Sequence, residues 1–359
     1  MKKIYLSTLI FITSLSFFTE VKAQGDCTTT LQEAQTIYDE GRIHEVEEKL
    51  KDCLKSGFTS EEKVQALKLM ALTYLYMDEP EKADEMILGI LEENPLFKPN
   101  PAVDPVEFIN LYESFRTTPI FRVGIKGGLN YAKPNFTSGG GVNNLNDLNL
   151  RGENKLALGY RLGVAFELPL NKKMTLGTEL KYVSTSFKME NLSLITDFQG
   201  NLVTDNLLIT TISSYELPAY LQYKVMDIKS KELYKNSNVF VFLGGSVEYN
   251  TGASSIALRN VENNQPVKEA NYNLDYIVKL NYSAILGIGA KIQIGTGYFI
   301  TDVKYRYGIM EVTDYTNSLN DLQPYYFDHY ADYNTYKLTS LTLSVGYLQN
   351  IYNPKKKTK

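Results

Sequence analysis

Residues 160–173 read YRLGVAFELPLNKK, and their side chains alternate in character along the chain. Large apolar side chains occupy every second position from Tyr160 to Leu168, and arginine, glycine, alanine and glutamate lie between them. Because successive side chains in a β-strand point to opposite faces, this pattern predicts a strand with one apolar face. That face would pack in the core of a soluble sandwich, or it would face lipid on a closed barrel.

Eight segments between residues 121 and 347 share this alternation, and each is long enough for a tilted membrane strand of about 9–11 residues. The connections at 171–173 and 295–297 are tight, whereas others are long and polar. Short turns on one side and long loops on the other are typical of outer-membrane barrels. We therefore expect an eight-stranded antiparallel up-and-down transmembrane β-barrel over residues 119–352, with its apolar face toward lipid. The long connections are expected at 132–157, 185–208, 250–278 and 311–336.

The opposite face of these strands would line the barrel interior, and it carries charges of both signs. The interior of an eight-stranded barrel is just filled by side chains, and buried charges need partners. We expect a salt-bridged plug that closes the lumen; a narrow polar channel is the alternative. The predicted lumen charge network consists of Arg122, Lys126, Arg161, Glu167, Glu179, Lys181, Glu216, Lys224, Glu248, Lys291, Asp302, Lys304 and Arg306.

The region before the barrel has helical periodicity, and the period changes at Pro119. Five helices are expected between residues 24 and 118, and the third and fourth resemble a tetratricopeptide repeat, whose packing positions fit their spacing. A generic stack of helical hairpins is the alternative. Those packing positions are held by Leu67, Ala71, Tyr74, Ala83, Ile87, Ile90 and Pro95.

The two cysteines of the chain fall in this helical region. Cys27 begins one expected helix and Cys53 ends its antiparallel partner, which brings them together in space. In an exported protein a disulfide is the expected state of such a pair. We therefore predict a Cys27–Cys53 disulfide.

The N-terminus predicts export. Lys2 and Lys3 precede a largely apolar run, and Val21 and Ala23 fit the −3 and −1 positions of a secretory cleavage site, so residues 1–23 are expected to be a signal peptide. The net charge of −4 provides no basic field suited to nucleic acid. The expected organisation is a signal peptide at 1–23, a periplasmic helical domain at 24–118, a barrel at 119–352 and a basic tail at 353–359.

Several strand segments also resemble a known family. ELPAYLQYKV, VFLGGSVEY, ILGIGAKIQIG, YFITDVKYRYGI and LSVGYL resemble strands of the PorT-like outer-membrane protein β-barrel domain family, over about residues 119–352. The resemblance implies an eight-stranded outer-membrane barrel, associated in some members with type IX secretion, and it supplies no catalytic residues. The helical N-terminal domain and the C-terminal NPKKKTK depart from that family.

Residue sets typical of catalysis are scarce. Asp328, His329 and Asp332 in the last long loop have only loose spacing for a metal site or an Asp–His pair. The segment GIGAKIQIG lacks the third glycine of a dinucleotide fingerprint. We therefore predict no catalytic residues, no cofactor and no metal.

These features predict a non-enzymatic outer-membrane barrel that anchors a periplasmic protein-interaction domain. Helical repeats bind protein segments, so periplasmic or outer-membrane proteins are the expected partners of residues 27–115, besides outer-membrane lipid. The expected role is a scaffold or accessory component of an envelope assembly or secretion complex. A transport or ligand-binding barrel for a small solute is the alternative, and a surface enzyme that uses the last extracellular loop is a third interpretation.

Overall fold

The chain divides into two compact units, a helical one that extends to Thr118 and a β unit from Pro119 to Ile351; the segment from Tyr352 groups with the helices. None of the helices that the structure describes is long and apolar enough to cross a membrane. The predicted signal peptide lies outside the described residues. The computed structural model describes residues 24–140, 153–155, 157–191, 195–196, 202–228, 237–261, 265–266, 270–273, 276–314 and 333–357.

The described part of the helical unit contains the five helices that the periodicity predicts. Helices α2 and α3 pack against each other, and α4 packs against α5 and α6. The apolar positions at helical spacing form the core: Leu50, Ala71, Ile87 and Ile90 are buried. The helices are α2 (Gln24–Asp39), α3 (Ile43–Lys55), α4 (Ser60–Tyr76), α5 (Pro80–Glu93) and α6 (Val106–Glu113).

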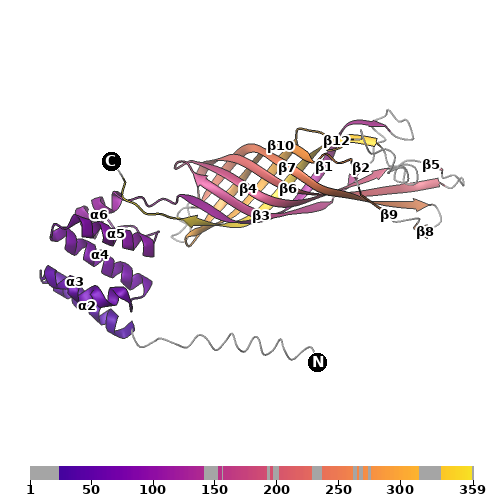
Figure 1. Ribbon diagram of the computed structural model, residues 1–359. Coiled ribbons are helices and arrows are strands. Elements are labelled where there is room, and N and C mark those ends of the chain that lie inside the picture. The colour runs from indigo at the N-terminus through magenta and orange to yellow at the C-terminus, as the bar shows by residue number, and fades with distance from the viewer. Residues whose placement is uncertain are drawn as a thin grey trace, which may run out of the picture. The chain divides into compact units, whose positions relative to one another are not determined.

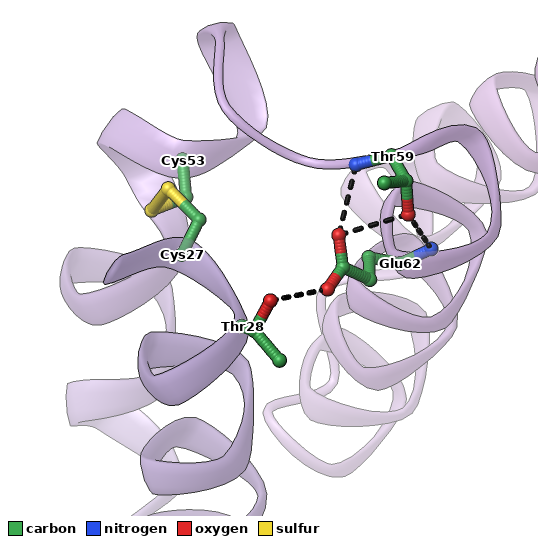
Figure 2. Close-up of a disulfide and its surroundings, with 5 residues drawn as sticks. All are labelled: Cys27, Thr28, Cys53, Thr59 and Glu62. Atoms are coloured by element: carbon green, nitrogen blue, oxygen red, sulfur yellow. Dashed lines mark hydrogen bonds between the residues drawn. A yellow bond between two sulfur atoms is a disulfide. The ribbon is translucent and has the colours of Figure 1, made fainter. Parts of the chain in front are cut away.

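A disulfide and a hydrogen-bonded cap join the ends of three helices (Figure 2). Cys27 in α2 is bonded to Cys53 in α3, with their Cα atoms 5.6 Å apart, which confirms the predicted disulfide. Thr59 and Glu62 form a capping box at the start of α4. The hydroxyl of Thr28, next to Cys27, donates to Oε1 of that same Glu62 at 2.6 Å. The start of α2 is therefore tied to both α3 and α4.

The basic C-terminal segment is part of the helical unit. Lys356 forms an antiparallel bridge with Phe115, just after α6. The N–H of Arg116 donates to the carbonyl oxygen of Lys355 at 2.9 Å, and the N–H of Lys357 donates to that of Ser114 at 2.8 Å. Its backbone is thus hydrogen-bonded to the helical unit, where the sequence predicted only a basic tail.

The β unit is a closed ring of eight long antiparallel strands, as predicted (Figure 1). Each strand pairs with its neighbour in sequence, and β1 pairs with both β3 and β12, which closes the ring. The ring strands are β1 (Phe121–Gly140), β3 (Leu158–Pro169), β4 (Met174–Asn191), β6 (Leu202–Asp227), β7 (Asn238–Val261), β10 (Leu280–Ile294), β11 (Gly297–Gly308) and β12 (Tyr333–Ile351).

Several strands continue into segments that the sequence analysis assigned to loops. Strand β4 runs to Asn191 and pairs with β6 as far as Asn206, so the expected loop at 185–208 is largely strand. Strand β7 likewise runs to Val261, into the loop expected at 250–278. Short strands pair near these extensions, namely β2 (Glu153–Lys155), β5 (Ile195–Thr196), β8 (Gln265–Pro266) and β9 (Ala270–Asn273).

The extension of β4 was not predicted because the alternation reverses its polarity there. Nearer the short turns, outward residues such as Leu180 and Leu343 are more than half exposed, at 54% and 56%. Beyond Tyr182, three of the four buried inward residues of β4 are apolar, namely Val183, Phe187 and Met189, whereas Ser186 and Lys188 point outward. A strand pattern with an apolar inner face and a polar outer face fits water outside the barrel, so the reversal marks where the predicted lipid band ends.

Tyrosines lie at this reversal on neighbouring strands. Tyr182, Tyr215 and Tyr249 are direct neighbours across β4, β6 and β7. The rings of Tyr182 and Tyr215 have centroids 5.8 Å apart, and Tyr160 on β3 lies 6.2 Å from Tyr182. Amphipathic aromatic rings favour the boundary between membrane and water, so this belt agrees with the predicted band.

Candidate functional site

A buried carboxylate inside the barrel gathers three lysines. Oε1 and Oε2 of Glu179 on β4 accept hydrogen bonds from Lys126 at 2.7 Å and Lys304 at 3.4 Å, and Lys181 lies 2.5 Å away. The hydroxyl of Tyr220 also donates to Glu179, at 2.6 Å. All five side chains are buried. Buried charges are costly unless they are paired and hydrogen-bonded, so this cluster joins β1, β4, β6 and β11.

Glycines supply the space that these long cationic side chains occupy. Lys126 has Gly163 and Gly346 as its direct neighbours on β3 and β12, and Gly163 is also the neighbour of Lys181. A Cβ atom on Gly163 would lie 2.1 Å from the carbonyl oxygen of Leu180 and 2.6 Å from Cγ of Lys181. The glycine-rich inner face is therefore the steric complement of the lysines.

Further ion pairs continue the network to neighbouring strands. Arg161 on β3 donates to Glu216 on β6 at 2.8 Å, and Lys181 lies 3.7 Å from the same carboxylate. Lys126 also contacts Asp302 on β11, at 2.6 Å. Lys126 and Lys181 thus bridge separate carboxylates, so that the charges form one connected cluster.

A second group lies on the loop side of this cluster. Arg306 on β11 forms a buried ion pair with Glu248 on β7. Ser214 donates to the other oxygen of Glu248 at 2.6 Å, and Nε of Arg306 donates to Ser340 at 3.3 Å. The guanidinium and the carboxylate are therefore both hydrogen-bonded as well as paired.

A third group lies toward the short turns. Glu167 on β3 accepts hydrogen bonds from Arg122 at 3.1 Å and from Lys291 at 2.7 Å. The amide of Gln222 donates to Glu167 at 2.7 Å, and its carbonyl oxygen accepts from Lys291 at 2.6 Å. One carboxylate therefore serves two cations at this end of the barrel.

Lys224 lies apart from the rest of the predicted network. It pairs at 2.9 Å with Asp227, and the two side chains are 30% and 62% exposed. Lys224 is near the end of β6, where solvent reaches it and Asp227 is three residues away. The alternation of the strand predicts that the Lys224 side chain points inward, but it does not predict that Asp227 is its ion-pair partner.

An apolar cluster packs inside the barrel at its loop side, where loops and not strands were predicted. Seven of its nine residues come from segments that were assigned to loops, and Ile212 and Leu338 lie just beyond those segments. For β4, the signal that would have found them is the reversed alternation after Tyr182, where Phe187 and Met189 alternate with Ser186 and Lys188. The cluster consists of Phe187, Met189, Leu208, Ile212, Tyr276, Ile277, Val312, Tyr336 and Leu338.

Little space remains between this apolar cluster and the charges. The cavity that separates them is lined by Ile212, Glu248, Arg306 and Leu338, among others, and has a volume of about 10 Å³. A cavity of roughly 10–15 Å³ by this measure holds one water molecule. The described side chains therefore leave room here for about one water and not for a solute.

The described residues contain no group of three or more His, Cys, Asp and Glu side chains arranged to hold a metal ion. The loop set of Asp328, His329 and Asp332 lies outside the described residues. The carboxylates of the interior are each engaged by cations or hydroxyls, as described above. Their arrangement holds neighbouring strands together.

The helical unit differs from the barrel in charge. Residues 24–118 contain 20 acidic and 9 basic residues, a net charge of −11. Tyr76, at the end of α4, is 67% exposed, and its ring lies 6.0 Å from that of Tyr38 in α2. This unit therefore presents an aromatic pair on an acidic surface.

The sequence profile described as "Outer membrane protein beta-barrel domain" matches residues 116–314, more than half of the chain. The chain belongs to this family. Its closed ring of eight strands with outward apolar side chains has the architecture that the family description names, and the family locates the barrel in an outer membrane, in contact with its lipid. A search of curated proteins found no match to this chain.

Solved structures with a similar fold include outer-membrane and surface proteins. Ail of Yersinia pestis is 12% identical, with 63% of this chain and 97% of that chain covered and a TM-score of 0.28. Neisserial surface protein A is 12% identical, with 64% and 97% covered and a TM-score of 0.28. OprG of Pseudomonas aeruginosa is 11% identical, with 66% and 98% covered and a TM-score of 0.32. Similarities this distant identify no ligand or partner of this chain.

Proposed function

We propose that this chain is a non-enzymatic outer-membrane anchor for a periplasmic protein-interaction domain, and that it acts as a scaffold or accessory component of an envelope assembly or secretion complex. The observation that carries the proposal is the filled interior. Ion pairs and the apolar cluster leave a cavity of about 10 Å³ between them. A barrel packed in this way supports an anchoring role better than a role as a passage.

The strand count supports a periplasmic location for the helical unit. With eight strands, the start of β1 at Phe121 and the end of β12 at Ile351 lie at the same end of the barrel. The tight turns at 170–173 and 295–296 lie at that end as well. Short turns of outer-membrane barrels face the periplasm, so residues 24–118 are proposed to lie there.

The surface of the helical unit suggests the kind of partner. We propose that its tetratricopeptide-like stack binds a protein with a basic surface, because residues 24–118 carry a net charge of −11. Tyrosine is enriched among the residues that dominate binding energy at interfaces. Tyr76, which is 67% exposed beside Tyr38, is the side chain we expect to anchor that contact.

Crosslinking of the intact chain in its native envelope, followed by mass spectrometry, tests this function. A basic envelope protein should crosslink to residues 24–118 of the wild type, and the yield should fall at least fivefold in Tyr76→Ala. The control is Val103→Ala, which truncates a side chain that is 74% exposed on the same unit. If Tyr76→Ala and the control crosslink like the wild type, Tyr76 is not the anchor.

A small-solute transport barrel is the competing function, and it is tested separately. The filled interior predicts that purified full-length protein conducts no ions in a planar lipid bilayer. Steady conductance steps that scale with the amount of inserted protein would favour transport and overturn the anchoring proposal.

A further inference from the structure

The turn-side end of the barrel contains a small cavity with cationic walls. Its volume is about 60 Å³, and none of the described residues that line it is acidic. The residues used below, which we name the basic cup, are Arg122, Lys172, Lys173, Gln222, Lys224 and Lys291.

The floor of the basic cup is built from buried groups. Lys291 is 4% exposed and Gln222 is 2% exposed, and the two are hydrogen-bonded to each other at 2.6 Å. The Lys291 ammonium also lies 4.8 Å from the ring centroid of Phe240. This lysine therefore has a fixed position, unlike a solvated lysine on a surface.

The rim of the basic cup is held by the turn between β3 and β4. The Asn171 side chain accepts hydrogen bonds from the N–H groups of Lys173 and Met174, both at 2.8 Å. The N–H of Lys224 donates to the carbonyl oxygen of Lys173, also at 2.8 Å. The backbone that carries Lys172 and Lys173 is thus fixed beside the cavity.

Positive charge exceeds negative charge in the basic cup. Arg122 and Lys291 share the single carboxylate of Glu167, at 3.1 and 2.7 Å. Lys224 pairs with Asp227 at 2.9 Å, and no carboxylate among the described residues pairs with Lys172 or Lys173, so five cations face two carboxylates. Desolvated cations that share a carboxylate attract a further anion, and the low dielectric of the barrel wall strengthens that attraction.

The size of the cavity selects the anion. One water needs roughly 10–15 Å³ by the same measure, so about 60 Å³ accommodates a group of several water-sized atoms. That size fits a tetrahedral oxyanion, and any larger group attached to the anion would extend out of the cavity past the exposed Lys172 and Lys173. Lysine and arginine are the side chains that recognise phosphate groups.

We propose that the basic cup binds a phosphate-type anion, which is either free phosphate or the headgroup of a phospholipid at the turn-side rim of the barrel. The two sources share the same chemistry at the cavity. They differ in whether binding persists when the protein is surrounded by uncharged detergent alone.

The test uses full-length protein in uncharged detergent, titrated with inorganic phosphate in a calorimeter at low and high NaCl. The diagnostic variant is Lys172→Gln with Lys173→Gln, on the exposed turn. The matched control is Lys188→Gln with Lys279→Gln, which removes the same charge at the loop side of the barrel. We expect phosphate to bind the wild type and the control alike, to bind the diagnostic variant at least tenfold more weakly, and to lose affinity as salt rises.

A second arm identifies a lipid source. The three proteins are placed in nanodiscs of phosphatidylcholine with phosphatidylglycerol, and the lipids that remain bound after extraction are counted by native mass spectrometry. Absence of phosphate binding in detergent, together with phosphatidylglycerol retained by wild type and control but lost from the diagnostic variant, supports the headgroup. Equal phosphate affinity in wild type and diagnostic variant, or no phosphate binding together with equal lipid retention in all three proteins, overturns the proposal.

Discussion

Nζ of Lys126 lies 2.7 Å from Oε1 of Glu179 inside the barrel, although the two residues are 53 positions apart in the chain. The pair connects β1 and β4, which are separated by β3 in the ring. An ion pair that crosses a neighbouring strand constrains how far the three strands can slip past one another. The interior charges therefore stabilise the register of the ring as well as filling its lumen.

Glu179→Gln should destabilise the barrel strongly. The change leaves Lys126, Lys181 and Lys304 buried without their shared carboxylate, and breaking a buried ion pair costs about 3–5 kcal/mol. The denaturant midpoint of the detergent-solubilised barrel, followed by its heat-dependent migration on a gel, measures the loss.

The control for this change is Asp227→Asn, which breaks an ion pair whose carboxylate is 62% exposed. An exposed pair contributes about 0–1 kcal/mol, so its midpoint should hardly move. Similar shifts in both variants would show that the interior carboxylate has no special role in stability.

The two faces of β10 should respond differently to substitution. Leu286 faces outward and is 53% exposed, so Leu286→Arg should cost roughly 2–4 kcal/mol if it lies near the bilayer midplane. From sequence, Gly287→Ser on the inner face is expected to be milder. The structure reverses that expectation, because a Cβ atom on Gly287 would lie 2.4 Å from the carbonyl oxygen of Val303 and 2.3 Å from Cζ of Phe242.

Folding yield into detergent micelles measures both changes, and Leu286→Ala provides the control. We expect Leu286→Arg and Gly287→Ser to lower the yield, whereas Leu286→Ala keeps an apolar outer face and should fold almost as well as the wild type. Normal folding of Gly287→Ser would mean that Val303 and Phe242 can move away from the inner wall of β10 at little cost.

Alternation along single strands predicts the direction of a side chain but not its neighbours. It predicts that Lys126 and Lys304 point inward, because direction depends only on the period of two, and both side chains are buried. It cannot predict that Lys126 lies between Gly163 and Gly346, since register is a property of strand pairs. The alternation also predicts that Lys224 and Lys126 both lie in the buried network. Their positions along the strands differ, however, and Lys224 lies near a strand end where water reaches it.

The loop-side extensions were missed for a related reason. A search for apolar outer faces rejects residues such as Phe187, whose strand turns its apolar side inward once it leaves the lipid band. The period of two alone, without regard to which face is apolar, would have extended β4 to its observed end. The face that carries the apolar residues then indicates whether lipid or water surrounds the strand.

Removal of the disulfide should affect the helical unit alone. Cys27 and Cys53 have a sequence separation of 26. In the chain-entropy model, a disulfide that closes a loop of that length stabilises the folded state by roughly 3–4 kcal/mol. Cys53→Ala should make residues 24–60 more susceptible to added protease, while the heat-dependent gel shift of the barrel stays unchanged. Loss of that gel shift would mean that the barrel depends on the helical unit to fold.

Glu62 should make the helical unit sensitive to acid. Hydrogen bonds from the Thr28 hydroxyl, and from the backbone and hydroxyl of Thr59, lower the pKa of Glu62. A carboxylate with a lowered pKa stabilises the fold above its unfolded pKa, and this contribution is lost as the pH falls through the folded pKa. Hydrogen exchange of residues 24–76 in the full chain should therefore be faster in Glu62→Gln at neutral pH, and the difference should disappear as the pH falls through the lowered pKa of Glu62. A difference that persists in acid would show that the effect comes from packing and not from the carboxylate.

The orientation of the barrel in the membrane can be tested with protease on whole cells. The ends of the barrel at Phe121 and Ile351 lie with the short turns, so residues 24–118 should be sheltered on the periplasmic side. The opposite ends of these strands, at Gly140 and Tyr333, should lie outside the cell and should be reached by impermeant labels added to intact cells. A tag at residue 24 should survive on intact cells and be lost once the outer membrane is permeabilised. Removal of that tag from intact cells would place the helical unit outside the cell, and the periplasmic scaffold role would have to be abandoned.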